Sequence, residues 1–199
     1  MRKINIAVLV SGGGTNLQAI IDEAAKGNIP SGELKLVLSN KEGAFALERG
    51  KKAGIETLTL LKKDLGEAFE DRIIEELKSR NIEIIVLAGF MSILSEKFTK
   101  TFENRIINVH PSLIPSFCGK GFYGLKVHEA ALSYGVKVTG ATVHFVNEIP
   151  DGGEIIMQKA VEIKEGDTPE ALQLRVMQEA EWKILPAALE KVCNKLLNS

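Results

Sequence analysis

Two polar residues, Asn108 and His110, stand two positions apart in the otherwise apolar run INVHPSLIPS. In a β-strand, residues i and i+2 point to the same face, so both side chains would emerge together where the strand ends. Open α/β sheets place their chemistry at that edge. An imidazole can transfer protons, and an amide can donate to an oxygen that gains charge in a reaction. Taken alone, the pair is more typical of a structural contact between buried polar groups.

A third candidate, Asp151, precedes two glycines in EIPDGGEII. Asp-Gly is an ordinary turn signal, but this turn follows the next strand after the proline loop. We therefore expect Asp151 to face His110 and to raise the pKa of its imidazole, which would make it a general acid near neutral pH. Asn108, His110 and Asp151 are together the parts of an acyl-transfer site without a Ser or Cys nucleophile. His144 in TVHFV is a weaker candidate, because a lone His within a strand is usually a packing residue.

A glycine-rich loop, LVSGGGTNLQ, links the first apolar run to the first helical pattern. Consecutive glycines let backbone N–H groups approach an anion, and the helix N-terminus adds partial positive charge. No Lys follows the glycines as in a Walker A loop, and Leu17 stands where a dinucleotide motif needs its third Gly. The loop favours a single phosphate monoester, with side-chain hydrogen bonds from Thr15 and Asn16. A tight turn capped by Thr15 is the alternative.

The alternation of apolar runs and amphipathic segments predicts the fold class. Over the first hundred residues it is typical of βαβ units, and the early runs lack the polar alternation of half-exposed strands. VKVTGATVHFV and GEIIMQKAVEI alternate more and are joined by NEIPDGG, which predicts an antiparallel hairpin. A final helix is expected to begin near Asp167 or Thr168 and to reach about Leu197, bent near Pro186. The prediction is an α/β fold with a seven-stranded, mostly parallel twisted sheet, helices on both faces, a Rossmann-like N-terminal half, and a C-terminal hairpin plus long helix.

Composition narrows the class of partner. The 199 residues suffice for one well-buried domain and make two full ones improbable. Lys plus Arg number 25 against 26 Asp plus Glu, a formal charge of -1, which argues against nucleic acid and membrane partners and favours a small molecule. The N-terminus shows no long apolar span or cleavage site, so a cytoplasmic protein is expected. Cys118 and Cys193 have no disulfide or metal-ligand spacing, and no bound metal is expected.

Five segments in order, SGGGTNLQAI, VLAGFMSILS, NVHPSLIPSF, TGATVHF and DGGEII, resemble those of the phosphoribosylglycinamide formyltransferases. The similarity covers essentially the whole chain. It implies a single formyltransferase domain over residues 1–199, with a phosphate-binding half (1–100) and a catalytic and folate-binding half (101–199). It also implies transfer of a formyl group from 10-formyltetrahydrofolate to the glycine amine of glycinamide ribonucleotide, a step of de novo purine biosynthesis, without a metal. The chain would be a monomer or a homodimer.

The resemblance also implies roles for individual residues. Asn108, His110 and Asp151 match the catalytic trio of the family. The substrate phosphate would be held by Gly14, Thr15 and Asn16, and the substrate ribose by Glu181. The folate-binding residues would be Phe90, Met91, Ser92, Ile93 and Leu94, together with Asn108. Ordinary packing after a buried strand explains the FMSIL stretch equally well.

Three departures from the family pattern bear on the ligands. The family commonly has Arg where Ser92 stands and often another near Gly66, so contacts to the charged tail of the folate are expected to be weaker. The loop from Ser116 to His128 looks longer than usual, and its glycines suit a mobile lid. Trp182 replaces the usual His after Glu181.

Other functions remain open at this point. A formyltetrahydrofolate hydrolase would share the Asn, His and Asp core, but we would expect a further domain before residue 1. A methionyl-tRNA formyltransferase would need a further C-terminal domain and a basic surface. A nucleotide-binding module without catalysis would keep the phosphate loop, and its polar trio would be merely structural.

Overall fold

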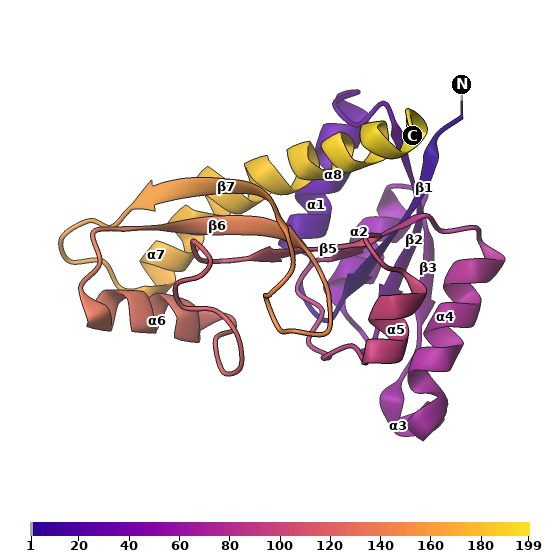
Figure 1. The fold of residues 1–199 in the computed structure, drawn as a ribbon, viewed down its shortest axis with the longest axis horizontal. Coiled ribbons are helices and arrows are strands. Elements are labelled where there is room, and N and C mark those ends of the chain that lie inside the picture. Colours follow the sequence, from indigo (N-terminus) through magenta and orange to yellow (C-terminus); the bar gives the residue numbers. More distant parts are fainter. Residues whose placement is uncertain (1) are drawn as a thin grey trace.

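Within residues 2–199, which the computed structural model describes, the strands form one seven-stranded sheet (Figure 1). The strands are β1 (Ile4–Val10), β2 (Gly32–Ser39), β3 (Glu56–Thr59), β4 (Ile84–Leu87), β5 (Ile106–His110), β6 (Val138–Phe145) and β7 (Ile155–Glu162). Their order in the sheet is β3-β2-β1-β4-β5-β6-β7. All pairings from β3 to β5 are parallel, whereas β6 runs antiparallel to both β5 and β7. The predicted α/β class and the C-terminal hairpin are confirmed.

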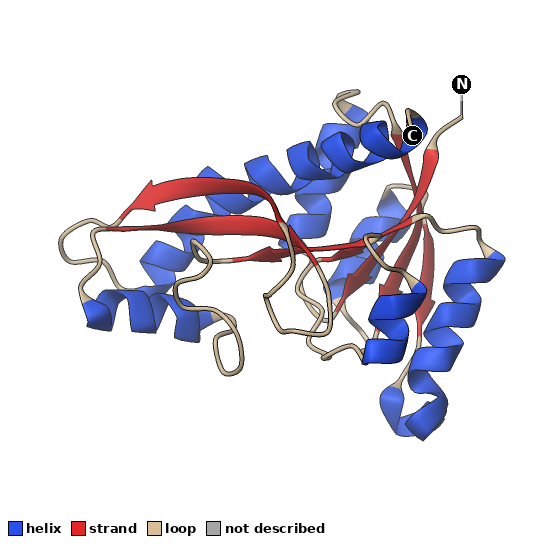
Figure 2. Cartoon of the chain, in the orientation of Figure 1, coloured by secondary structure: helices blue, strands red, loops and turns tan. Residues whose placement is uncertain are grey.

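Helices cover both faces of the sheet, as predicted (Figure 2). One layer contains α1 (Thr15–Ala25), α2 (Phe45–Lys52), α7 (Pro169–Val176) and α8 (Trp182–Leu197). The opposite layer contains α3 (Lys62–Leu65), the short turn η1 (Gly66–Ala68), α4 (Phe69–Ser79) and α5 (Glu96–Thr101). The remaining helix, α6 (Leu125–Tyr134), packs against α7 beside the hairpin.

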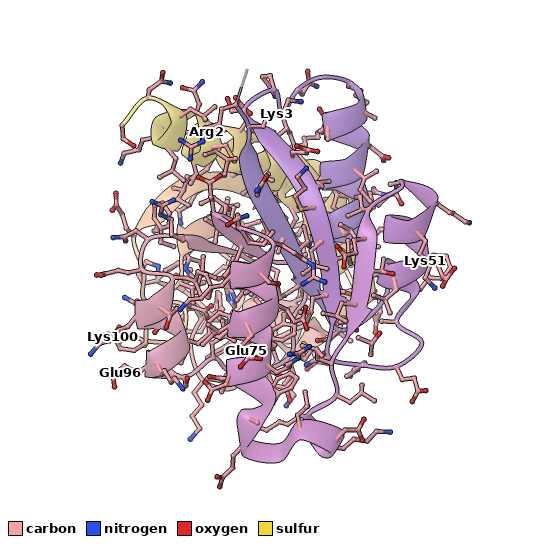
Figure 3. The ribbon with its side chains drawn as sticks, turned by 90° about the vertical axis from the view of Figure 1, so that its right-hand side faces the viewer. Arg2, Lys3, Lys51, Glu75, Glu96 and Lys100 are labelled. Carbon is pink, nitrogen blue, oxygen red and sulfur yellow. The ribbon has the colours of Figure 1, made fainter. Side chains whose placement is uncertain are left out.

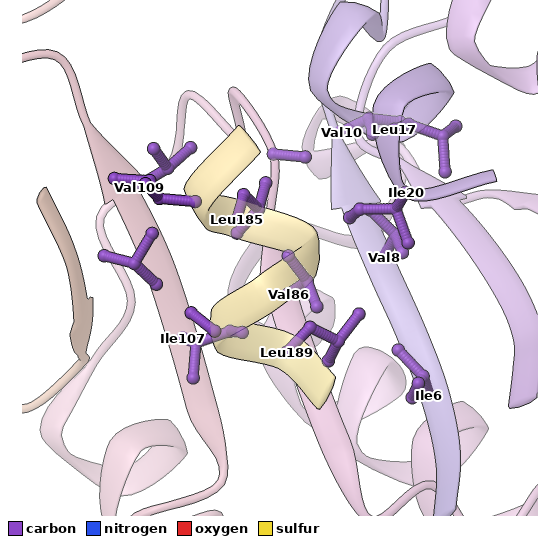
Figure 4. Packing of buried hydrophobic residues seen from close by; sticks show 14 of the residues in the cluster. Ile6, Val8, Val10, Leu17, Ile20, Val86, Ile107, Val109, Leu185 and Leu189 are labelled. Carbon is purple, nitrogen blue, oxygen red and sulfur yellow. The ribbon is translucent and has the colours of Figure 1, made fainter. Parts of the chain in front are cut away.

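Strand periodicity explains why the early runs lack polar alternation. Successive residues of β1 enter opposite layers, so Val8 packs with α1 and α8 while Leu9 packs with α4. Both are fully buried. In the first layer, Leu185 and Leu189 of α8 lie over Ile107 of β5 (Figure 4). Each such buried leucine stabilises the fold by about 1.5–3 kcal/mol, so this packing holds the C-terminal helix across the central strands.

Charged side chains of the helices point outward, away from these apolar layers. Lys51, Glu75, Glu96 and Lys100 point away from α2, α4 and α5 (Figure 3). Glu96 and Lys100 form an ion pair at 2.6 Å with both side chains mostly exposed. Exposed pairs of this spacing contribute only about 0.3–0.5 kcal/mol, so the apolar layers, not the surface charges, stabilise the arrangement that positions the site.

The C-terminal helix begins where it was predicted but is irregular at another place. Thr168 is the N-cap of α7, because its hydroxyl accepts a hydrogen bond from the Ala171 N–H at 3.2 Å. A wide π-type turn, η2 (Met177–Glu181), connects α7 directly to α8. Pro186 itself lies inside α8, and the bend expected near it stays a prediction. The carbonyl that Pro186 leaves without its usual donor, four residues earlier, belongs to Trp182, where α8 starts after the wide turn.

None of the helices in residues 2–199 has the length and apolar character needed to cross a membrane.

The close approach of β6 and β7 generates a stability prediction. A Cβ atom at Gly140 of β6 would lie 2.1 Å from the Lys159 carbonyl oxygen of β7. We expect Gly140→Ala to lower the free energy of unfolding by about 1–3 kcal/mol, because the strands must separate to admit the methyl group. Urea denaturation measures the change. Gly12→Ala is the control, since a Cβ there meets nothing within 4 Å, and equal stability of the two variants would contradict the prediction.

Candidate active site

The Asn and His that begin the site lie on one face of β5, as their spacing predicted. Asn108 and His110 share the face of Ile106, which packs in the layer of α4 and α5. The antiparallel ladder pairs Asn108 with His144 and His110 with Thr142. The loop of residues 111–124 and the β6–β7 connection both lie on this side of the sheet (Figure 1). Two loops from distant parts of the sequence therefore enclose these side chains.

Asp151 reaches this cluster from the β6–β7 connection. Its Oδ2 lies 3.5 Å from Nδ1 of His110, and its Oδ1 lies 3.6 Å from Nε2 of His144. The Gly119 N–H donates to Oδ2 at 2.8 Å. Asp151 has a left-handed backbone with φ of 56°, which Asp tolerates better than most residues. A Cβ at Gly153 would lie 1.8 Å from the Phe145 carbonyl oxygen, so the DGG sequence lets the connection fold closely against β6.

The His110 ring is fixed from the opposite side by the backbone. Its Nε2 lies 2.9 Å from the carbonyl oxygen of Phe117, to which it donates. Nδ1 is then the nitrogen that faces Asp151. Burial lowers the pKa of His110 below its ordinary 6.5, although the Phe117 carbonyl and Asp151 both act to raise it and His144 acts to lower it. The expectation that Asp151 raises this pKa overall is therefore wrong, because burial outweighs the carboxylate.

His144 belongs to the same cluster, although the sequence favoured a packing role for it. Its Nδ1 donates to the Phe145 carbonyl oxygen at 2.7 Å, and the Asn108 amide nitrogen lies 3.2 Å from its Nε2. Asn108 is left with a second amide proton. The only sequence signal was that His144 lies on a strand next to β5. The strand register that places His144 opposite Asn108 cannot be predicted from the sequence of either strand alone.

The glycine loop presents backbone donors at the start of α1. Gly14 is the N-cap, has φ of 71°, and supplies no side-chain cap to the first N–H groups of the helix. A Cβ on Gly14 would lie 2.6 Å from that of Ala46, so α2 packs directly on the loop. Thr15 and Asn16 follow as the first two helical residues. Asn16 uses one amide proton to donate to Glu181 at 2.7 Å, which leaves its other one for a ligand.

Glu181 connects the C-terminal helix to this loop. Its side chain is buried, and burial raises the pKa of its carboxyl group although the Asn16 hydrogen bond acts to lower it. A cleft of about 260 Å³ lies between Thr15 of α1, Arg49 of α2 and Trp182 of α8, and Glu181 is not among the residues that line it. Arg49 donates to the Gly13 carbonyl oxygen at 2.8 Å. The predicted phosphate-binding and ribose-binding residues therefore lie together around one loop.

The predicted folate-binding stretch follows the carboxyl end of β4. Its side chains divide into two sets: Phe90 and Leu94 pack on the core, whereas Met91 and Ile93 are 57% and 85% exposed. Exposed apolar side chains at a sheet edge that already carries polar groups are typical of a ligand surface. Ser92 lies between the two exposed residues.

Hydrogen bonds hold that stretch to residues that follow the ends of β1 and β2. The Met91 N–H donates to the Ser11 hydroxyl at 2.8 Å, and the Asn40 amide donates to the Ser92 hydroxyl at the same distance. Ser92 is thus bonded within the protein, and it offers no charge to a ligand. No group of three or more His, Cys, Asp or Glu side chains in residues 2–199 is arranged to hold a metal ion.

The seven-stranded α/β sheet is the fold of the formyl transferases. A family model described as "Formyl transferase" matches residues 4–189. The chain is 43% identical to "Phosphoribosylglycinamide formyltransferase" of Escherichia coli (strain K12), over 94% of this chain and 85% of that protein. The chain therefore belongs to the phosphoribosylglycinamide formyltransferase family, and the resemblance read from its motifs is confirmed.

Other relatives differ in length. The chain is 46% identical to "Trifunctional purine biosynthetic protein adenosine-3" of Gallus gallus over 96% of this chain, but it spans only 19% of that protein. The crystal structure of glycinamide ribonucleotide transformylase 1 from Symbiobacterium toebii superposes with a TM-score of 0.90 at 40% identity, covering 97% of this chain and 89% of that one. The structure of phosphoribosylglycinamide formyltransferase from Brucella melitensis gives 0.88 at 39% identity, covering 96% of each chain.

A third buried histidine of the region predicts how stability depends on pH. His128 of α6 is fully buried, and neither ring nitrogen has a partner among the described residues. Burial, helped by His110, lowers the pKa of His128 from 6.5 to about 4. Between these values the unfolded chain binds a proton that the folded chain does not, so stability falls as the pH falls.

We expect the free energy of unfolding to decrease by up to about 3 kcal/mol from this group between pH 6.5 and pH 4. His128→Leu removes the titrating group and should flatten that part of the curve, measured by urea denaturation at a series of pH values. An unchanged pH dependence in the variant would show that His128 is not the group responsible.

Proposed function

We propose that this protein transfers the formyl group of 10-formyltetrahydrofolate to the glycine amine of glycinamide ribonucleotide, giving formylglycinamide ribonucleotide and tetrahydrofolate. The observation that carries the proposal is the cluster of Asn108, His110, His144 and Asp151, with neighbouring groups 3.2 to 3.6 Å apart. It offers a proton acceptor, amide donors and a carboxylate in one buried place. The names of the relatives support the choice of donor and acceptor.

The spacing of the sheet suits this acceptor. The phosphate of the nucleotide would lie at the N-terminus of α1, on Gly14, Thr15 and Asn16, with Glu181 beside the ribose. The loop follows β1, and His110 ends β5, with β4 between the two strands. Two strand separations amount to roughly 10 Å, comparable with the length of a ribose phosphate bearing a short amide. An anchored phosphate would thus bring the amine to His110.

The chemistry follows from which groups carry charge. The amine attacks the formyl carbon, and the oxygen that becomes negative accepts from the second amide proton of Asn108. His110, neutral in the free protein, takes the proton lost by the attacking nitrogen at Nδ1, and the resulting imidazolium is stabilised by Asp151. The same proton then passes to the folate nitrogen as the carbon–nitrogen bond to the folate breaks. Asp151 can also hold a water that relays it.

The donor would lie along the stretch after β4. The pterin would meet the backbone there, walled by the exposed Met91 and Ile93, with Phe90 and Leu94 supporting them and Asn108 at the reacting end. Because Ser92 carries no charge, recognition of the acidic tail of the folate is expected to be weak. The proposal includes neither nucleic acid nor a membrane as a partner. It places the protein in the cytoplasm, where it acts as a monomer or a homodimer.

The direct test mixes the purified protein with glycinamide ribonucleotide and 10-formyltetrahydrofolate and measures the formylated nucleotide. We expect product only when both are present. Formate released without the nucleotide would favour a hydrolase instead. Binding of the nucleotide with neither product would indicate a binding module.

Asp151→Asn separates catalysis from binding. Loss of the carboxylate removes the partner of the charged His110, so we expect transfer to fall below detection while affinity for glycinamide ribonucleotide changes by less than about threefold. Because Asp151 acts to raise the pKa of His110, an NMR titration should place that pKa lower in the variant than in the wild type. Asp167→Asn, at a carboxylate paired with Arg175 beside α7, is the matched control. Full transfer activity in Asp151→Asn would reject the mechanism.

A further inference from the structure

The residue that fixes the His110 ring has an unusual backbone. Phe117 has φ of 49°, a left-handed conformation that costs a bulky residue about 1–2 kcal/mol. Such a conformation persists only when the surroundings enforce it, and it often accompanies function. Here it directs the Phe117 carbonyl at Nε2 of His110, at 2.9 Å. Two residues later, the Gly119 N–H donates to Asp151, so one short segment contacts both members of the acid–base pair.

Two aromatic side chains hold Phe117 in place. The ring of Phe122 meets that of Phe117 edge-on with centroids 6.3 Å apart, and the ring of Tyr134 does so at 5.9 Å. A turn closed by the Phe122 N–H and the Gly119 carbonyl oxygen, at 3.1 Å, folds Phe122 back onto Phe117. Tyr134 is 81% exposed and is the last residue of α6, so it contributes little to the core. Edge-on aromatic pairs are stabilising beyond their buried area.

We propose that Phe117, supported by Phe122 and Tyr134, is a positioning residue for His110: its carbonyl holds the proton on Nε2 and so presents Nδ1 to the reacting amine. The inference deepens the proposed function, on which its kinetic part rests. Phe122 lies in the loop that was predicted to extend from Ser116 to His128. That loop ends earlier than predicted, at Gly124, because α6 begins at Leu125. The packing of Phe122 on Phe117 gives the loop a role. The aromatic support acts through the backbone and touches no substrate.

The charged and titratable groups around the ring are known, so the expected changes have a direction. Asp151 faces Nδ1, His144 of β6 and His128 of α6 lie nearby, and the Phe117 carbonyl faces Nε2. Of these, the Phe117 carbonyl and Asp151 favour the charged ring. Weakening the carbonyl contact should therefore lower the pKa of His110 and let the proton of the neutral ring distribute over both nitrogens.

The experiment compares the double variant Phe122→Ala/Tyr134→Ala with wild type. We expect kcat to fall about tenfold with KM for both substrates within about twofold, because the reacting group is misaligned rather than the ligands lost. Nitrogen NMR of His110 in the ligand-free protein should show a lower pKa and a mixture of the two neutral ring forms. This second readout does not need turnover, so it still decides the inference if the wild type has no transferase activity.

Matched controls separate this role from general damage. Tyr123→Ala removes a neighbouring aromatic ring that packs with Lys126 at 4.6 Å instead, and Tyr134→Phe keeps the ring. Both should behave as wild type. The single Tyr134→Ala variant, at an exposed position, keeps the test valid if the double variant unfolds, and it should shift His110 in the same direction. Wild-type His110 titration and ring form in the double and single alanine variants, or equal loss of kcat in Tyr123→Ala, would overturn the proposal.

Discussion

The antiparallel pairing of β6 with β5 is the contact on which the site depends. A further parallel strand would require a crossover connection, usually a helix, that covers one face of the sheet. Here β5 and β6 run antiparallel, and their connection, which includes α6, packs against α7 beside the hairpin. The face that carries Asn108 and His110 is enclosed by the loop of residues 111–124 and by the β6–β7 connection. The same pairing sets His144 directly opposite Asn108. It also begins the hairpin whose connection brings Asp151 to the imidazoles.

Burial and charge act in opposition on this cluster. Burial lowers the pKa of both His110 and His128. For Asp151, burial acts to raise the pKa, but the neighbouring His144, the Gly119 N–H and His110 act to lower it, and the pKa is lowered overall. Near neutral pH the free site therefore holds an ionised carboxylate beside neutral His110. That distribution suits a site that must receive one proton from an attacking amine, which is different from a site that starts as an acid.

Much of the fold could be predicted from the sequence because local periodicity carries it. The i, i+2 spacing of Asn108 and His110 gave their common face, apolar runs gave the buried parallel strands, and Thr168 with Pro169 gave the start of the last helix. These signals lie within one element each. The phosphate-binding role of Thr15 and Asn16 was predicted from the glycine loop at the helix N-terminus, whereas the roles of the ribose and folate residues came from the family resemblance. All of these roles stay proposals.

What could not be predicted depends on relations between elements. The register of β6 against β5 decides that His144 joins the cluster, and no pattern within either strand states it. The pKa of His110 depends on how deeply two loops bury the ring. The direction of its shift could therefore not be predicted from the nearby carboxylate alone. The irregular turn before Trp182 was also hidden, because Pro186 was the more visible signal.

That wide turn has a geometric consequence for the two ends of the site. Each residue of an α-helix advances by about 100° around the axis, so one additional residue in a turn rotates everything after it relative to everything before it. The rotation lets α7 keep Leu172 and Val176 on the sheet, while α8 keeps Leu185 and Leu189 there as well. Glu181, at the end of the turn, is released from either apolar stripe and faces Asn16. In a regular helix, that carboxylate and those leucines would point toward the same side of the helix.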